Sequence, residues 1–379
     1  MDDKLIWLGL CEASGIGWKR MKDILQNHVD LRELPEWDAG SWRGLGMPEK
    51  VAQSLPEQLQ PEYLQTKIKK YEEQGIHIIT MLDEEYPTLM KETFQPPWIL
   101  YAKGRVELLS SFCIGMVGTR VPTAYGRKVG ELLAGEMAER GVTIVSGMAR
   151  GIDSVCHEAA LRANGQTIAV LGTAIDTIYP AENRSLYHRI ADQGLVLSEY
   201  PIGTKSSPGL FPQRNRIISG LSYGSVVVEA DARSGSLITA DFAMEQNRDV
   251  FAVPGPITSP KSQGTLSLLK QGAILVTSTE DIMKEYDSSL IKRCDNPYEM
   301  KEKSSQISAS KPPISDFSAK FDLTTDEKTI YLILEQGDAT IDELHIQSKF
   351  DFGLLHTVLL SLIIKKQISQ RSGALYTLI

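Results

Sequence analysis

The sequence predicts an α/β protein whose central part forms a doubly wound, Rossmann-like parallel sheet. Between residues 111 and 287, seven short apolar runs rich in β-branched residues alternate with helical patterns. Glycines, hydroxyl side chains or arginines follow several of these runs, and 11 of the 16 basic residues in this part are arginine. Strands that alternate with helices imply right-handed βαβ crossovers. Ligands of such folds bind at the carboxyl ends of the strands, so we expect a crevice there.

The composition describes a soluble globular protein with two or three domains, since the chain has 379 residues, 42% hydrophobic and 23% charged. No apolar run approaches a membrane span and the N-terminus lacks the order of a signal peptide, so we expect a cytoplasmic protein with no membrane contact. The four cysteines form no Cys-x-x-Cys pair, which argues against zinc and a disulfide framework. A net charge of -8 requires any bound anion to occupy a focused site.

Residues 1–95 are predicted to form an N-terminal helical domain of the helix-hairpin-helix or SAM-like kind. Gly15-Ile16-Gly17 and Gly44-Leu45-Gly46 each separate two helical patterns. Such turns can present backbone amides to DNA phosphates, and they can equally be helix C-caps in a small bundle. Both interpretations stay open at this point.

Residues 96–287 are predicted to form the Rossmann-like domain, which the chain enters through an extended edge segment at 96–101. The expected strands are the runs 114–117, 142–145, 167–171, 195–197, 225–228, 250–253 and 273–276. Their length and β-branched content favour buried strands of a parallel sheet.

Residues 288–322 are polar and aperiodic, which predicts a flexible linker. Helical patterns at 326–335, 340–347 and 352–365, and two short strands around Ser372-Gly373, then predict a winged helix over 323–379. This fold often contacts duplex DNA, but only Lys349, Lys365 and Lys366 are basic near its second and third helices. A DNA-binding role and a protein-docking role are both open.

The loops after the strands carry the residues that suit phosphate binding. Glycines let the backbone approach an anion, helix N-terminal amides point at it, and arginine grips phosphate oxygens in a bidentate manner. Asp153 is expected to cap the helix that follows its loop, and His157 is expected to be a hydrogen-bonded structural residue. The predicted DNA-binding residues are Gly118, Thr119, Arg120, Ser146, Gly147, Arg150, Gly151, Thr173, Tyr179, Asn183, Arg184, Arg214, Asn215, Arg216, Ser234, Gly235 and Ser236.

An aromatic side chain beside arginines favours single-stranded nucleic acid, because bases stack on aromatic faces while cations follow the backbone. Tyr179 stands in such a place, although it can equally be a buried turn residue before Pro180. No dinucleotide or P-loop fingerprint and no serine-hydrolase or zinc-protease motif is present, so we expect neither catalysis nor a cofactor or metal. One alternative is a nucleotide- or phosphoribosyl-processing enzyme with Glu229 or Asp231 as its acid. Another is a transcription factor that uses the winged helix.

Five segments in order resemble those of the DNA-processing protein A family, also called Smf. They are Ser-Gly-Met-Ala-Arg-Gly-Ile-Asp (146–153), Tyr-Pro-Ala-Glu-Asn (179–183), Ser-Glu-Tyr-Pro (198–201), Phe-Pro-Gln-Arg-Asn-Arg-Ile-Ile-Ser-Gly-Leu (211–221) and Ser-Gly-Ser-Leu-Ile-Thr-Ala (234–240). The resemblance covers the middle domain. It implies a non-enzymatic, dimeric protein that binds single-stranded DNA and loads the RecA recombinase onto incoming strands in natural transformation, which requires competence.

The resemblance also carries two binding positions onto this chain. They fall on Arg120, in a Gly-Thr-Arg segment whose middle residue is usually serine, and on Arg184 after the Tyr-Pro-x-x-Asn segment. Arg150, Arg214 and Arg216 are added by the expected geometry of the crevice. Ala174 and Leu266 depart from the family, which commonly has glycine and asparagine there, and the first change could narrow the third loop.

Overall fold

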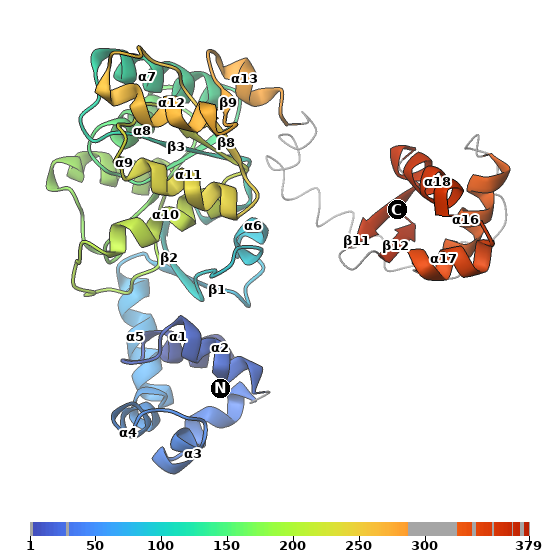
Figure 1. The fold of residues 1–379 in the computed structure, drawn as a ribbon. Helices are drawn as coiled ribbons and strands as arrows, with labels where there is room; N and C mark the ends of the chain where they lie inside the picture. The colour runs from blue at the N-terminus through green and yellow to red at the C-terminus, as the bar shows by residue number, and fades with distance from the viewer. Residues whose placement is uncertain are drawn as a thin grey trace. The chain divides into compact units, whose positions relative to one another are not determined.

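The computed structural model describes residues 3–27, 30–286, 324–335, 339–350, 352–365, 367–371 and 375–378. The chain divides into two compact units, Met1–Ser305 and Gln306–Ile379, each of which has its own buried core. The first unit holds both the N-terminal helices and the large sheet (Figure 1). The predicted linker at 288–322 lies outside the described residues, and the predicted domain boundaries stay predictions.

The N-terminal part is helical, as the sequence predicts. Gly15 and Gly46, with φ of +92° and +84°, form the turns between α1 and α2 and between α3 and α4, where residues with a side chain would be strained. Ile6, Leu10 and Trp42 are buried in its core. The elements are α1 (Asp3–Glu12), α2 (Trp18–Gln26), η1 (Leu31–Glu36), α3 (Ala39–Gly44), α4 (Glu49–Gln58) and α5 (Pro61–Glu73).

Aromatic side chains connect these helices to the sheet. The Trp98 indole stacks on that of Trp18, with ring centroids 5.3 Å apart, and Trp7 donates from its indole nitrogen to the Trp98 carbonyl at 2.8 Å. Beside them the Glu12 carboxylate accepts hydrogen bonds from the hydroxyls of Tyr71 and Tyr101. The N-terminal helices are thus part of the same compact unit as the sheet.

The central sheet has the order β1-β2-β6-β5-β4-β3-β7-β8-β9 within the described residues. All seven predicted strands are present and lie parallel to one another. The predicted edge segment is β2, which pairs antiparallel with β6, and β1 is a further antiparallel strand that the sequence analysis did not predict. The strands are β1 (His77–Thr80), β2 (Ile99–Gly104), β3 (Cys113–Val117), β4 (Thr143–Ser146), β5 (Thr167–Val170), β6 (Leu195–Ser198), β7 (Gly224–Val227), β8 (Asp249–Ala252) and β9 (Ile274–Leu275).

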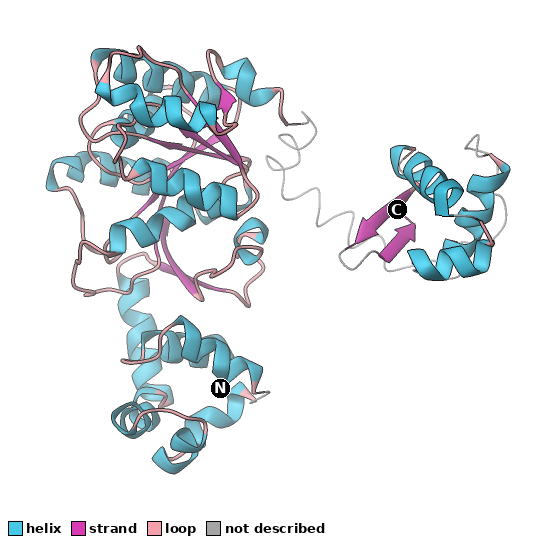
Figure 2. Ribbon diagram, viewed as in Figure 1, coloured by secondary structure: helices cyan, strands magenta, loops and turns pink. Residues whose placement is uncertain are grey.

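Helices flank the sheet, so the inner strands β3 to β7 are buried on both faces (Figure 2). Two of the core clusters lie between the strands and these helices, which explains why the strands read as continuous apolar runs. The remaining elements of the unit are α6 (Thr88–Lys91), η2 (Val106–Ser110), α7 (Ala124–Glu139), α8 (Ile152–Arg162), η3 (Ala181–Asn183), α9 (Arg184–Gln193), α10 (Leu210–Leu221), α11 (Ser236–Glu245), η4 (Pro260–Ser262), α12 (Gln263–Lys270) and α13 (Thr279–Met283).

The order of the strands reverses between β3 and β7. From β3 the chain adds β4, β5 and β6 on one side, and it then returns to place β7, β8 and β9 on the other side. The loops that leave β3 and β7 therefore run in opposite directions, and such a switch point leaves a crevice at the carboxyl ends of the strands.

Within its described residues, the C-terminal unit has three helices and a small antiparallel sheet. Its elements are α16 (Thr325–Glu335), β10 (Ala339–Thr340), α17 (Ile341–Ser348), α18 (Phe352–Ile364), β11 (Ile368–Arg371) and β12 (Leu375–Leu378), with the sheet order β10-β12-β11. The three predicted helices and two terminal strands are present, and β10 is an additional strand. The predicted turn at Ser372-Gly373 and Lys366 lie outside the described residues.

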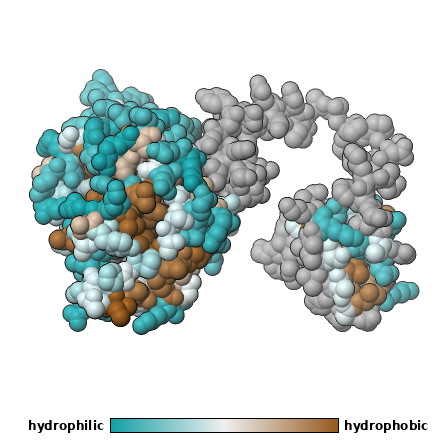
Figure 3. All heavy atoms as spheres, turned by 90° about the horizontal axis from the view of Figure 1, so that it is seen from above, coloured by the Kyte–Doolittle hydropathy of each residue, from teal (hydrophilic) through white to brown (hydrophobic). Residues whose placement is uncertain are grey.

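The surface of the protein is mixed in polarity. In the view of Figure 3, hydrophilic side chains cover the margins of the larger unit and apolar ones gather in a band across its middle. None of the described helices has the length and apolar character needed to cross a bilayer. The described residues also contain no group of three or more His, Cys, Asp or Glu side chains arranged to hold a metal ion.

Candidate functional site

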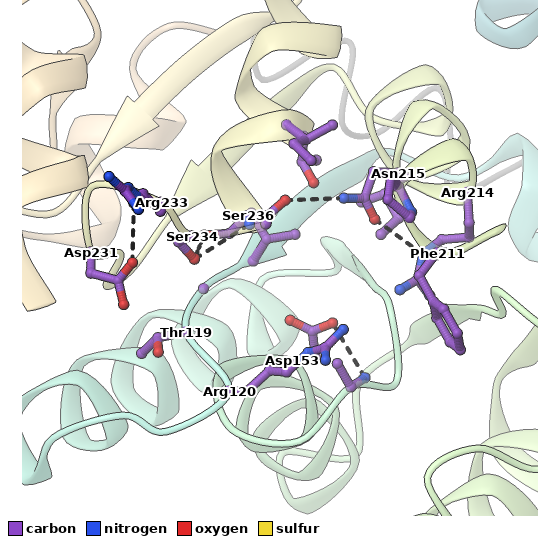
Figure 4. Close-up of a pocket in the computed structure, with 18 of the residues that line it drawn as sticks. Thr119, Arg120, Asp153, Phe211, Arg214, Asn215, Asp231, Arg233, Ser234 and Ser236 are labelled. Carbon is purple, nitrogen blue, oxygen red and sulfur yellow. Dashed lines mark hydrogen bonds between the residues drawn. The ribbon is translucent and has the colours of Figure 1, made fainter. Parts of the chain in front are cut away.

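A cavity of about 610 Å³ lies at the switch point of the sheet. Figure 4 shows the loop after β3 facing the loop between β7 and α11 and the start of α10 across this space. Its basic lining side chains are Arg120, Arg214, Arg233 and Lys261, and its acidic ones are Asp153 and Asp231. The hydroxyls of Ser234 and Ser236 and the rings of Tyr179 and Phe211 line the cavity as well.

The first loop, after β3, is fixed by its backbone. The Thr119 amide donates to the Glu229 carbonyl at 2.7 Å, and the Thr119 carbonyl accepts from the Ile152 amide at 3.2 Å. Gly151 has φ of +82°, and a Cβ atom there would lie 2.3 Å from the Thr119 oxygen, so only glycine fits. The loop thereby exposes Arg120 at the cavity, where this side chain forms no ion pair with any described residue.

Arg214 forms part of the cavity wall. It is only 4% exposed, and its Nη1 donates to the Gly147 carbonyl at 2.6 Å and to the Val170 carbonyl. Burial lowers the pKa of Arg214 to about 10, which still leaves it charged at neutral pH. Because these carbonyls end β5 and follow β4, Arg214 holds two crevice loops together, and a direct phosphate contact by this side chain stays a prediction.

Asp153 supports the second loop, which follows β4. Its Oδ2 accepts from the amides of Gly147 and Ala149 at 3.2 and 3.3 Å. Burial raises the pKa of this carboxyl, and the Arg214 guanidinium acts in the opposite direction. The sequence predicted that Asp153 caps α8. The structure corrects this, because Gly151 occupies the N-cap and Asp153 binds loop amides instead.

Arg216 points away from the cavity, which corrects its predicted place in the crevice. Residues two positions apart on a helix lie on nearly opposite faces, so α10 cannot direct both Arg214 and Arg216 into one site. Arg216 is ion-paired with Glu199, and both side chains are largely buried. Asn215 lies on the cavity side, and its amide nitrogen donates to the Gly235 carbonyl at 3.2 Å. The assignment of Arg216 to DNA binding stays a prediction.

The third loop brings an aromatic pair to the cavity. Tyr179 is half exposed, and its ring centroid lies 5.1 Å from that of Phe211 at an interplanar angle of 49°. The alternative that Tyr179 is a buried turn residue is therefore wrong. Arg150 is exposed and paired with Glu182, which is exposed as well.

Asn183 and Arg184 lie farther along the same loop. The Asn183 side chain donates to the Met148 carbonyl at 2.8 Å and to the Ser154 hydroxyl at 2.9 Å, so it braces the second loop. Arg184 begins α9 with its side chain exposed, and it does not line the cavity.

Two predicted hydroxyls are not at the surface. Ser146 is the last residue of β4, fully buried, and its hydroxyl donates to the Met116 carbonyl at 2.6 Å. Thr173 is also buried and donates to the Thr177 carbonyl at 2.7 Å. Both side chains shape the strand ends, and the structure corrects their predicted exposure in the crevice.

The loop before α11 supplies hydroxyls and a second free cation. Ser234 and Ser236 share a hydrogen bond of 2.8 Å, and both line the cavity beside Gly235. Arg233 lies there too, exposed, and among the described residues it forms no ion pair. Arg233 was not among the predicted binding residues, although its place in the loop after β7 was the signal.

Lys261 is a further lining residue that sequence reasoning missed. Its Nζ lies 3.3 Å from Asp231 Oδ2 and 3.5 Å from the Thr119 hydroxyl. Lys261 belongs to η4, in a proline-containing segment after β8 that carries no phosphate-binding pattern. Only the tertiary fold brings it to the switch point.

Two other groups that the sequence singled out have structural environments. The Glu229 oxygens accept from the Thr123 amide and hydroxyl at 2.8 and 2.6 Å, so this carboxylate holds the N-cap of α7 and does not line the cavity. His157 is fully buried beside the Thr167 hydroxyl at 2.7 Å, and burial lowers its pKa to about 3. The prediction that His157 is a structural histidine agrees with this environment.

Comparison with known proteins finds one matching family model, described as DNA recombination-mediator protein A, over residues 77–287. DNA processing protein DprA of Bacillus subtilis (strain 168) is 46% identical over 230 residues, which are 60% of this chain and 77% of that protein. Protein Smf of Escherichia coli (strain K12) is 40% identical over 299 residues, 76% of this chain and 77% of that protein.

Two solved structures resemble the model. The X-ray structure of DNA processing protein A from Streptococcus pneumoniae has a TM-score of 0.66 and 36% identity, and the match covers 76% of this chain and 99% of that one. The second, from Helicobacter pylori, has a TM-score of 0.51 and 32% identity, and the match covers 56% of this chain and 97% of that one. The Helicobacter pylori study describes a single-stranded DNA binding mode of that protein.

Proposed function

The chain belongs to the DNA recombination-mediator protein A family, and we propose that it binds single-stranded DNA in the cavity at the switch point of its sheet. One observation supports this most: Arg120, Arg233 and Lys261 converge on the cavity from the loops after β3, β7 and β8. Arg214 lies buried beneath them and fixes the loops between which a strand would pass. Neighbouring cations at one focused place in an acidic protein suit the repeated phosphates of a nucleic acid.

The rim of the cavity favours a single strand over a duplex. Tyr179 and Phe211 present a tilted aromatic pair next to the cations, and unpaired bases stack on such faces for about 1–3 kcal/mol each. In a duplex the base faces are already stacked on one another. The single-stranded DNA binding mode described for the Helicobacter pylori protein supports the same choice.

Most of the predicted DNA-binding residues, all but Arg150, Arg184 and Arg216, then divide into two roles in this proposal. Residues at the cavity surface contact the strand, and they are Gly118, Thr119, Arg120, Tyr179, Asn215, Ser234, Gly235 and Ser236, joined by Arg233 and Lys261. Ser146, Gly147, Gly151, Thr173, Asn183 and Arg214 hold the loops in place.

The wider role follows from the family. We propose a non-enzymatic, cytoplasmic homodimer that protects incoming single strands and loads the RecA recombinase in natural transformation. For the C-terminal unit we propose a winged helix, because its helices and strands follow the order α-β-α-α-β-β. For the domains we retain the boundaries 1–95, 96–287, 288–322 and 323–379.

The alternative of a nucleotide- or phosphoribosyl-processing enzyme has weaker support. Of its two proposed acids, Glu229 is committed to Thr123 at the start of α7. Asp231 does line the cavity, where Lys261 is its ion-pair partner. Release of free base from a nucleoside monophosphate by the purified protein would favour this alternative.

The test is a fluorescence-anisotropy titration of labelled poly-dT and of a duplex of equal length at two salt concentrations. We expect tighter binding of the single strand and a loss of about tenfold in Arg120→Ala, whose salt slope should fall by roughly 0.7 for one lost phosphate contact. Arg140→Ala is the matched control, since Arg140 is another exposed arginine, which follows α7 just before the start of β4 and does not line the cavity. Equal affinity for both DNA forms, or equal loss in both variants, would contradict the proposal.

A further inference from the structure

A second groove adjoins the cavity on the side of α7 and α8. It has a volume of about 390 Å³ and is lined by Arg127, Arg150 and Arg162 among others. Arg150 also lines a small pocket together with Arg120, Tyr179 and Arg214, all of which belong to the cavity. The groove and the cavity are thus continuous through Arg150.

The acidic side chains of this groove are already paired. Glu131 is ion-paired with Arg162 at 3.4 Å, and Glu158 is ion-paired with Arg189, which lies outside the groove. Arg127 is exposed on the first turn of α7 and forms no ion pair with any described residue. Exposed pairs such as Arg162–Glu131 and Arg150–Glu182 are weak, so a phosphate group can replace the carboxylate at either arginine.

Arg184 is a predicted binding residue that lies near the groove. It does not line the cavity. Its neighbour Asn183 does line the groove, and the Arg184 side chain is exposed at the start of α9. A strand that reaches both Arg120 and Arg184 therefore leaves the cavity on the side of Arg150, where the groove begins.

We propose that the groove of Arg127, Arg150 and Arg162 is a second phosphate-binding subsite, which holds the backbone of the same DNA strand after it leaves the cavity. This inference rests on the proposed single-stranded DNA binding. The groove carries no exposed aromatic side chain among its lining residues, so it binds the backbone and leaves the bases free. Its contribution depends on strand length, because a short oligonucleotide fills the cavity alone.

The experiment compares the full-length protein with the double variant Arg127→Ala/Arg162→Ala on oligo-dT of roughly 6 and roughly 20 nucleotides, lengths that bracket common single-strand site sizes. Arg150 stays intact because it also borders the cavity. The expected result is unchanged affinity for the short oligonucleotide and a three- to tenfold loss, roughly, for the long one, with a salt slope lower by about 1.4 for two lost contacts. Lys128→Ala is the control, since Lys128 is the next residue on α7, is exposed and does not line the groove.

The outcomes separate the two proposals. If wild type binds neither oligonucleotide, single-stranded DNA binding itself is wrong. If wild type binds both and the double variant matches it at both lengths, the groove is not a subsite while the cavity proposal stands. An equal loss of affinity at both lengths, or the same loss in Lys128→Ala, also contradicts the subsite proposal. Either result indicates that the substitutions act through the overall electrostatic field of the protein and not through a contact beyond the cavity.

Discussion

The cavity and the C-terminal unit each bury an acid beside a base, and they differ in the charges that surround the pair. In the cavity Asp153 lies beside Arg214, and Arg120, Arg233 and Lys261 are arranged above that pair. In the C-terminal unit Glu327 accepts from Lys365 Nζ at 2.7 Å and from the Ser361 hydroxyl, while α17 and α18 contain no Lys or Arg at all. Both pairs serve folding, but the cavity also gathers Arg120 and Arg233, which form no ion pair with any described residue, at one place.

The largest effect is expected from Arg214→Ala. This change leaves Asp153 buried without its partner and leaves the Gly147 and Val170 carbonyls without a donor, so we expect a loss of about 3–5 kcal/mol in the free energy of unfolding. Urea unfolding of a fragment ending at Ser305 measures it. The added change Asp153→Asn should recover part of the loss, as expected for coupled residues. A loss below about 1 kcal/mol would show that Arg214 is not a structural residue.

Next come the two cations that sequence reasoning missed. Arg233→Ala and Lys261→Ala should each weaken binding of single-stranded DNA by about tenfold, because each removes one charge-assisted phosphate contact from the cavity. Neither change should alter the unfolding midpoint, since both side chains lie at the surface of the cavity. Anisotropy titration beside Arg140→Ala checks this. If either variant loses both DNA binding and stability, its side chain is a structural cation like Arg214, and the division into ligand-facing and structural cations is wrong.

The sequence predicted the framework of the site well because local patterns determine it. Seven parallel strands follow from apolar runs, and the loop after β3 follows from a glycine and an arginine directly after a strand. Three side chains lie elsewhere than the sequence predicted, for two different reasons. Arg216 faces Glu199 because of helical periodicity, and Ser146 and Thr173 are buried because of how the strand ends pack. Lys261 could not be found, since no local pattern links η4 to the loop after β3.

A smaller effect, on the stability of the C-terminal unit, is expected from a change at its buried acid, Glu327. Hydrogen bonds from Lys365 and Ser361 lower the pKa of Glu327 from an ordinary value of 4.5 to about 2. A lowered pKa means that the carboxylate stabilises the folded unit above pH 4.5 and that this contribution is lost as the pH falls towards 2. Glu327→Gln should therefore lower the melting temperature of residues 306–379 by several degrees at neutral pH and have no effect near pH 2.

Circular dichroism melts at several pH values test this, with Glu335→Gln as the control. Glu335 ends α16 with an exposed side chain, so its loss should matter at no pH. If Glu327→Gln lowers the melting temperature equally at all pH values, the stabilisation does not come from the charge of Glu327, and the parallel with Asp153 and Arg214 fails.

The smallest effect is expected when the C-terminal unit is removed. A chain that ends at Ser305 keeps the cavity and its cations, and α17 and α18 have no Lys or Arg to contribute phosphate contacts. Its affinity for a short single strand should stay within about twofold of the full-length value, with an unchanged salt slope.

The same titration with duplex DNA then tests the winged-helix alternative. A loss of tenfold or more for duplex alone would assign duplex contacts to this unit, through Lys349 or the backbone. A similar loss for the single strand would contradict the comparison itself, because affinity would then come from a unit in which Lys365 is already ion-paired with Glu327.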